Sequence, residues 1–209
     1  MKGGVLMENR RERTLELFEK VTGLIATPSP EDRRDKTALL VFLGGGNWHT
    51  CDLRLQVPWP IFTDKVWVAG MREENCIDYD LEVVKKQLMR GGRYPSHLRN
   101  QGWVELLNTR DQMLFAVEQV RSDATINHLV LSTAKYHVVR CALTFMKMWL
   151  QEGDGRNLDI SILPTSDPNK EEVADVVGTN TLPEAELDRI EIYQDKGDVA
   201  TAEDLERFL

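Results

Sequence analysis

His128-Leu129-Val130-Leu131-Ser132-Thr133 leads directly into Ala134-Lys135-Tyr136-His137-Val138-Val139-Arg140. The first run is short and apolar, which is typical of a strand buried on both faces. After it, apolar residues recur at spacings of three and four, which predicts a helix over 135–150 whose buried stripe is Val139, Leu143, Met146 and Leu150. This stretch therefore predicts a strand followed by a helix, the basic step of an α/β fold.

The same step recurs along the chain. Short connections between alternating strands and helices favour a mainly parallel sheet with helices on both faces, in a single α/β domain over 1–209. Apolar runs predict strands at 37–43, 65–70, 128–133 and 158–163, the last closed by Pro164. Helical patterns cover 79–90, 109–121, 184–196 and 202–209, and a helix at 9–25 has Leu15, Phe18, Val21, Thr22 and Ile25 on one side.

Charge and cysteine content narrow the class of protein. The net charge of -8, from 26 basic and 34 acidic residues, argues against a general nucleic-acid binder, which needs a basic face. Most of the excess lies in the helical tail, 166–209, with 13 Asp and Glu against 4 Lys and Arg; a solvated helical face is the plain interpretation. The 3 cysteines predict free thiols and a cytoplasmic protein. No apolar run reaches the roughly 18 residues of a membrane span, and no secretory signal is apparent.

Two segments have the residue types of an anion site. Gly44, Gly45 and Gly46 follow a buried strand, where glycine lets the backbone approach a ligand, although a plain tight turn would need the same residues. Asn108 and Thr109 stand at a helix start, and Gln112 lies three after Thr109 as in a capping box. Capping is the structural alternative there; the functional one is that the free amides and the helix dipole hold an anion.

A third segment adds reactive side chains. Tyr136, His137 and Arg140 fall within about 100° on neighbouring turns of the predicted helix. Arg140 could grip a phosphate or carboxylate with two parallel bonds, His137 could transfer a proton, and Tyr136 could position the ligand. The alternative is a polar helix edge in which Arg140 pairs with an acidic neighbour. His49, Cys51 and Cys76 do not have the spacing of a zinc site, so no metal is expected.

The glycine run after an apolar strand, Asn108-Thr109 and Tyr136-His137-x-x-Arg140 occur in an order that resembles the DUF218 family, the YdcF/SanA/ElyC-like group of bacterial proteins. The resemblance covers roughly 37–163, and the tail pattern Ile190-x-x-Tyr193-x-x-x-Gly197 is also similar. It implies a Rossmann-like three-layer fold, with these blocks at one edge of the sheet and S-adenosylmethionine or another nucleotide-like molecule as ligand. The chain departs from the family pattern at Leu106 and at Asp111-Gln112, and we expect no N-terminal membrane anchor of the kind that many members carry.

Two functional hypotheses follow. In the first, the chain binds an anionic, nucleotide-like small molecule at Gly44, Gly45, Gly46, Asn108, Thr109 and Tyr136. His137 and Arg140 would then be the candidates for hydrolysis or transfer at a phosphate ester. In the second, the chain is a non-catalytic regulatory or interaction protein whose acidic helical tail docks on a partner.

Overall fold

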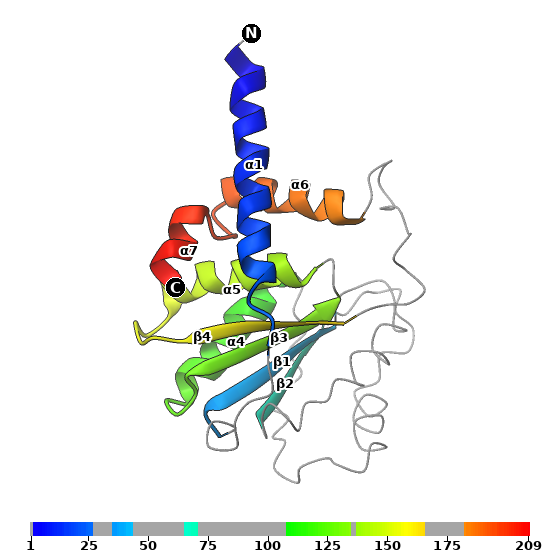
Figure 1. Ribbon diagram of the computed structural model, residues 1–209. Coiled ribbons are helices and arrows are strands. Elements are labelled where there is room, and N and C mark those ends of the chain that lie inside the picture. The colour runs from blue at the N-terminus through cyan, green and yellow to red at the C-terminus, as the bar shows by residue number, and fades with distance from the viewer. Residues whose placement is uncertain (1, 27–34, 44–64, 71–107, 135–136, 166–181) are drawn as a thin grey trace.

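The fold is built on a four-stranded, wholly parallel sheet in the order β2-β1-β3-β4. The computed structural model describes residues 2–26, 35–43, 65–70, 108–134, 137–165 and 182–209. The chain passes from β1 to β2 on one side and then crosses to β3 on the other side of β1, so the strand order reverses between β1 and β3 (Figure 1). The strands are β1 (Thr37–Leu43), β2 (Lys65–Gly70), β3 (His128–Ala134) and β4 (Asp159–Thr165).

The strand predictions are confirmed to within two residues, and burial explains why they succeeded. Ala38, Leu39 and Leu40 are all buried, as are successive residues of β3, so both faces of the sheet are covered. The prediction that Pro164 closes the fourth strand is wrong, because Pro164 lies within β4 opposite Thr133. β4 is the last strand of the sheet, and an edge strand tolerates a residue without an N–H.

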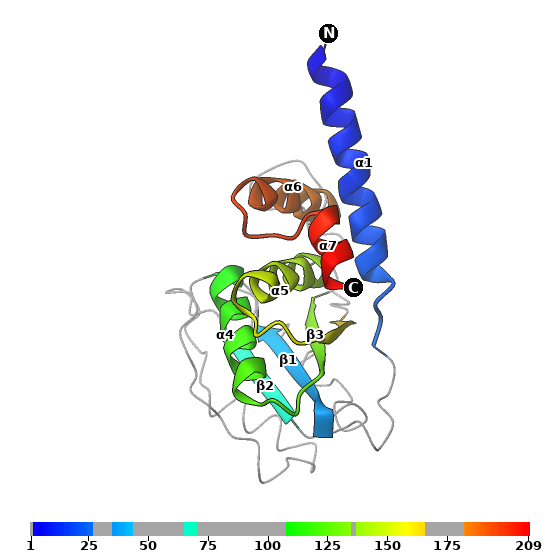
Figure 2. The ribbon, with the colours of Figure 1, turned by 90° about the vertical axis from the view of Figure 1, so that its left-hand side faces the viewer.

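The described helices form two tiers on one face of the sheet. α4 and α5 pack against each other and against the strands, while α1, α6 and α7 lie over α5 in an outer tier (Figures 1 and 2). The α/β class with a parallel sheet is therefore confirmed. The helix predicted at 79–90 lies outside the described residues. The helices are α1 (Lys2–Thr22), α4 (Thr109–Ser122), α5 (Val138–Glu152), α6 (Leu182–Asp195) and α7 (Ala202–Phe208).

The buried face of the N-terminal helix agrees only in part with the predicted one, since Val21 is buried and Phe18 packs against the core but other predicted residues do not. Leu15 is 43% exposed, whereas Thr14 and Leu17 are buried. Thr14 can be buried because its hydroxyl donates to the Arg10 carbonyl oxygen, so the face is set by a residue that the apolar pattern omits. The helix also ends at Thr22 and not at Ile25, which forms a parallel bridge with Ile162 beside β4.

Helix α5 is the centre of the core. The predicted stripe is present, but burial extends almost all round the first turns, because β3, α4, α1 and α7 surround the helix. A helix enclosed on several sides needs apolar residues beyond one stripe. Phe145 and Trp149 stack with ring centroids 6.0 Å apart, and Cys141 is buried in the same helix. Leu150, predicted in the stripe, is only half-buried.

The C-terminal helices dock on the rest of the chain. Asp204 of α7 accepts a hydrogen bond from Lys147 of α5 at 2.8 Å and completes a capping box with Thr201. On α6, Asp188 and Glu191 bind Arg11 at 2.9 and 3.1 Å.

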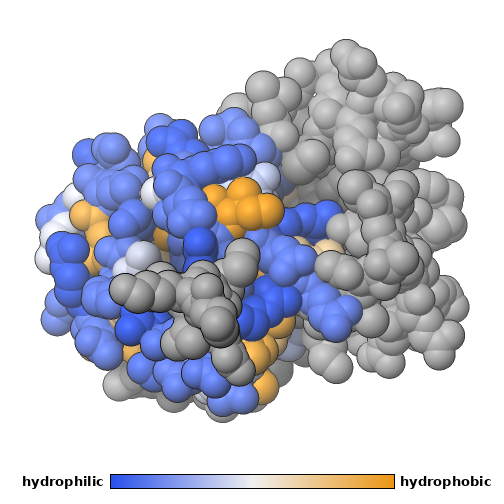
Figure 3. All heavy atoms as spheres, turned by 90° about the horizontal axis from the view of Figure 1, so that it is seen from above, coloured by the Kyte–Doolittle hydropathy of each residue, from blue (hydrophilic) through white to orange (hydrophobic). Residues whose placement is uncertain are grey.

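The outer face of the molecule seen in Figure 3 is largely hydrophilic, with hydrophobic side chains only in small groups. None of the helices that the structure describes combines the length and the apolar character needed to cross a membrane.

The central strand gives a direct test of this core. Leu131 of β3 is fully buried, so Leu131→Ala should leave a cavity and lower the free energy of unfolding by about 2–5 kcal/mol. The measurement is urea denaturation followed by circular dichroism. Glu118→Ala on the exposed side of α4 is the control and should change stability by less than about 0.5 kcal/mol. Equal effects of the two substitutions would contradict this arrangement.

Candidate functional site

The starts of α4 and α5 meet at the carboxyl edge of the sheet. Thr109 is the first residue of α4, and its hydroxyl oxygen accepts a hydrogen bond from Arg140 Nη1 at 3.1 Å. His137 is the N-cap residue of α5, and its Nδ1 lies 2.9 Å from Arg140 Nη2. Thr109, His137 and Arg140, separated in the sequence, are thus brought together. Gly44, Gly45, Gly46 and Tyr136 lie outside the described residues.

Arg140 is paired with an acidic residue that the sequence interpretation did not name. Glu186 of α6 accepts from Arg140 Nε at 2.7 Å and from Arg189 Nη1 at 2.7 Å. Its side chain is 1% exposed, so a carboxylate is buried between two guanidinium groups. Arg140 also lies over the Tyr193 ring, with its Cζ 5.6 Å from the ring centroid. The structural alternative stated for Arg140, a pairing with an acidic neighbour, therefore describes its contacts.

The surroundings of Glu186 keep it ionised. Burial alone would raise the pKa of this carboxyl, but the hydrogen bond and charge of His137 and those of Arg140 hold it well below the ordinary value. Arg140 contributes more than His137 to this lowering of the pKa. His137 could donate to Glu186 across their 3.4 Å contact only with a proton on Nδ1, and the shorter contact from Arg140 to the same nitrogen excludes that proton. Glu186 therefore has a guanidinium group on either side, from Arg140 and from Arg189.

The start of α4 is capped by one of the two residues proposed for that role. Asn108 Oδ1 accepts from the Asp111 amide at 3.0 Å, and Asn108 Nδ2 donates to the Asp111 carboxylate at 3.0 Å. The capping box with Gln112 is therefore wrong, because the cap stands one residue earlier than Thr109. Gln112 is buried instead, and within the segments that the structure describes its Nε2 has no hydrogen-bond partner.

Further unpartnered polar atoms lie at the end of β3. The Ser132 and Thr133 hydroxyls are fully buried, and within the part of the chain that the structure describes neither has a hydrogen-bond partner. Thr133 shares its face of β3 with Leu129 and Leu131, which pack under α5, whereas Ser132 points to the other face. A buried hydroxyl without a partner costs of the order of 1–3 kcal/mol, so these groups need an explanation.

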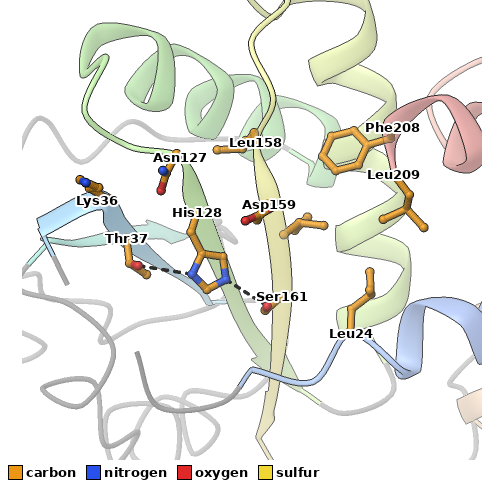
Figure 4. Close-up of a pocket in the computed structure, with 11 residues that line it drawn as sticks. Leu24, Lys36, Thr37, Asn127, His128, Leu158, Asp159, Ser161, Phe208 and Leu209 are labelled. Atoms are coloured by element: carbon orange, nitrogen blue, oxygen red, sulfur yellow. Dashed lines mark hydrogen bonds between the residues drawn. The ribbon is translucent and has the colours of Figure 1, made fainter. Parts of the chain in front are cut away.

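A second polar cluster lies at the opposite, amino edge of the sheet. His128 stands between Thr37 and Ser161, with ring nitrogens 3.3 and 3.0 Å from the two hydroxyl oxygens (Figure 4). The cluster borders a pocket of about 740 Å³ that Asn127 and Phe208 also line. These polar groups satisfy one another across three strands, and the pocket lies away from the edge where α4 and α5 begin.

Comparisons of the chain with protein-family models, with curated proteins and with solved structures find no match.

Sequence reasoning missed Glu186 because the acidic tail was interpreted as a solvated face. The available signal was local. Glu186 lies three before Arg189 and four before Ile190, so it shares a helix side with a residue of the apolar pattern.

The low pKa of Glu186 makes the stability of the junction depend on pH. Its folded pKa lies below the unfolded value of about 4.5, so its contribution is complete above that pH and is lost as the pH falls below it. Glu186→Gln should therefore lower stability at neutral pH and make the loss of stability on acidification shallower. Urea denaturation at pH ~7, ~5 and ~3 measures both effects.

Asp188→Asn is the matched control. Asp188 is on the same helix and also binds an arginine, but its side chain is 46% exposed. A solvent-screened ion pair contributes roughly 0–1 kcal/mol, so this substitution should leave the acid dependence close to that of the unmodified protein. If Glu186→Gln and the unmodified protein lost stability in parallel on acidification, the ionised buried carboxylate would be ruled out.

Proposed function

We propose that this protein binds an anionic, nucleotide-like small molecule at the carboxyl edge of its parallel sheet. The observation that carries the proposal is the Thr133 hydroxyl, which is fully buried on the α5 face at the end of β3 and has no hydrogen-bond partner among the described residues. A ligand oxygen at this position would accept its hydrogen bond. Ser132 and Gln112 offer further polar atoms at the same edge.

The topology supports this location. In open α/β sheets, ligands bind beyond the carboxyl ends of the strands where the strand order reverses, which here is the gap between β1 and β3. The α5 helix begins at this edge, and the His137 side chain does not cap it. A helix start attracts anions because its amides and its dipole point toward them. The guanidinium group of Arg140 lies at the same edge, 2.9 Å from His137 Nδ1.

The proposed roles follow from these contacts. Thr109 and Asn108 define the α4 start, and Gly44, Gly45, Gly46 and Tyr136 remain proposed ligand contacts. Because four hydrogen bonds of Arg140 go to Thr109, His137 and Glu186, its proposed role shifts from gripping the ligand to supplying charge behind the site. His137 is the proposed proton donor if the ligand is hydrolysed or transferred at a phosphate ester.

The family resemblance supports the same interpretation. We retain membership of the DUF218 family as a proposal, and with it a Rossmann-like three-layer arrangement in which helices also cover the second face of the sheet. The proposed ligand class includes S-adenosylmethionine and other nucleotide-like molecules. A cytoplasmic location is proposed with it.

The alternative function, an interaction module that uses its acidic tail, has less support. The described acidic groups of α6 are engaged within the chain: Asp188 and Glu191 with Arg11, and Glu186 with Arg140. Asp204 of α7 is bound to Lys147. A partner that recognised these carboxylates would have to replace contacts that already neutralise them.

Thr133→Val separates a binding role from a packing role. Valine keeps the shape of threonine without the hydroxyl, so it should weaken binding about fivefold to tenfold, as expected for one lost hydrogen bond. The same change should raise the stability of the ligand-free protein, because it removes an unsatisfied buried group. Calorimetric titration with adenosine monophosphate and with S-adenosylmethionine gives the affinities, and urea denaturation gives the stability.

Ser161→Ala is the control at the other end of the sheet. Its hydroxyl is bonded to His128 at the amino edge, so its loss should leave ligand affinity unchanged. The proposal fails if neither compound binds the unmodified protein, or if Thr133→Val and Ser161→Ala weaken binding equally.

A further inference from the structure

We propose that Glu186 is a positioning residue of this site, which acts through Arg140 to hold the His137 imidazole in one tautomer, with its proton on Nε2. The inference rests on the proposed function for its purpose, since the imidazole so held would serve the anion. The contacts that fix the tautomer join only Glu186, Arg140 and His137, which all lie within the described residues.

Glu186 fixes the orientation of the Arg140 guanidinium group. Its two carboxylate oxygens accept from Arg140 Nε at 2.7 Å and from Nη2 at 3.4 Å. This is the two-pronged geometry that suits a planar guanidinium and a carboxylate. Nη1 is bound in turn to Thr109 at 3.1 Å, so the plane of the group is fixed from both sides.

The hydrogen bond between Arg140 and His137 can run in one direction only. Arginine has donors only, so at the 2.9 Å contact Nη2 donates and Nδ1 must accept. The ring proton therefore stands on Nε2. The opposite tautomer would point an Nδ1–H toward the Glu186 oxygen 3.4 Å away, but it would also bring that hydrogen against the donor on Arg140. The shorter contact decides between them.

The buried ion pair between Glu186 and Arg140 adds less to the stability of the fold than apolar packing would. Burying an ion pair between packed helices stabilises a fold less well than apolar side chains of similar volume do. Arg189 lies on the same helix as Glu186 and already binds it at 2.7 Å, so the carboxylate has a counter-charge without Arg140 and His137. Hydrogen bonds that run from Glu186 through Arg140 to the imidazole of His137 are the arrangement expected where the orientation of that ring serves a ligand.

The test reads the tautomer directly. Long-range proton–nitrogen correlation spectra of the 15N-labelled protein distinguish a protonated from a bare ring nitrogen, and His137→Asn identifies the signals of His137. We expect the Nε2–H tautomer in the unmodified protein and a mixture of tautomers in Glu186→Gln. Arg140→Lys should give the same mixture, because one ammonium cannot bridge Glu186, Thr109 and His137.

Lys147→Met is the control for general loosening of the helices. It removes the buried contact to Asp204 that ties α7 to α5, at a distance of 2.8 Å, and it should leave the His137 tautomer unchanged. An Nδ1–H tautomer in the unmodified protein would overturn the proposal without recourse to any variant. So would a mixture of tautomers in Lys147→Met, because that effect would be general.

A binding measurement separates this inference from the function on which it rests. With inorganic phosphate and adenosine monophosphate as probes, Glu186→Gln should bind about tenfold more weakly than the unmodified protein, as for other groups that orient a ligand-binding imidazole. If the unmodified protein binds neither probe, the proposed function fails while the spectra still decide the tautomer. If both proteins bind equally although the tautomer changes, Glu186 has no role in binding.

Discussion

The buried carboxylate of Glu186 fixes more of this molecule than any other single group. A carboxylate with 1% exposure has to be neutralised where it lies, and Arg189 of the same helix and Arg140 of α5 both bind it. That requirement places α6 across the start of α5, and through the Arg140–Thr109 bond it also fixes the start of α4. Three helices from distant parts of the chain are thereby held at one edge of the sheet.

The same edge combines strong and weak points of the fold. Arg140 makes four hydrogen bonds at the salt-bridged junction, yet the neighbouring Thr133 and Ser132 hydroxyls are buried without partners among the described residues. Unsatisfied groups that persist beside a rigid framework are common where a protein is shaped for a ligand, because the ligand and not the free protein completes the bonding. The amino edge differs, since Thr37, His128 and Ser161 satisfy one another.

Much of the fold could be predicted from the sequence, because apolar runs such as 37–43 and 128–133 record burial on both faces directly. The errors came from residues whose surroundings differ from their usual ones. Thr14 is buried because it bonds its own helix, and Pro164 is tolerated because β4 is an edge strand. Local spacing could have placed Glu186 on the buried side of α6 but not against Arg140, because the two residues are separated by 46 positions and no local spacing encodes that contact.

The ion pairs between α1 and α6 also bear on how the chain is made. Arg11 and Asp188 are separated by 177 residues, so α1 emerges from the ribosome long before the helix that neutralises it exists. During synthesis, the buried side of α1, with Leu17 and Val21, has to wait until α5 and then α6 have emerged. The docking of α1 therefore follows the synthesis of both α5 and α6.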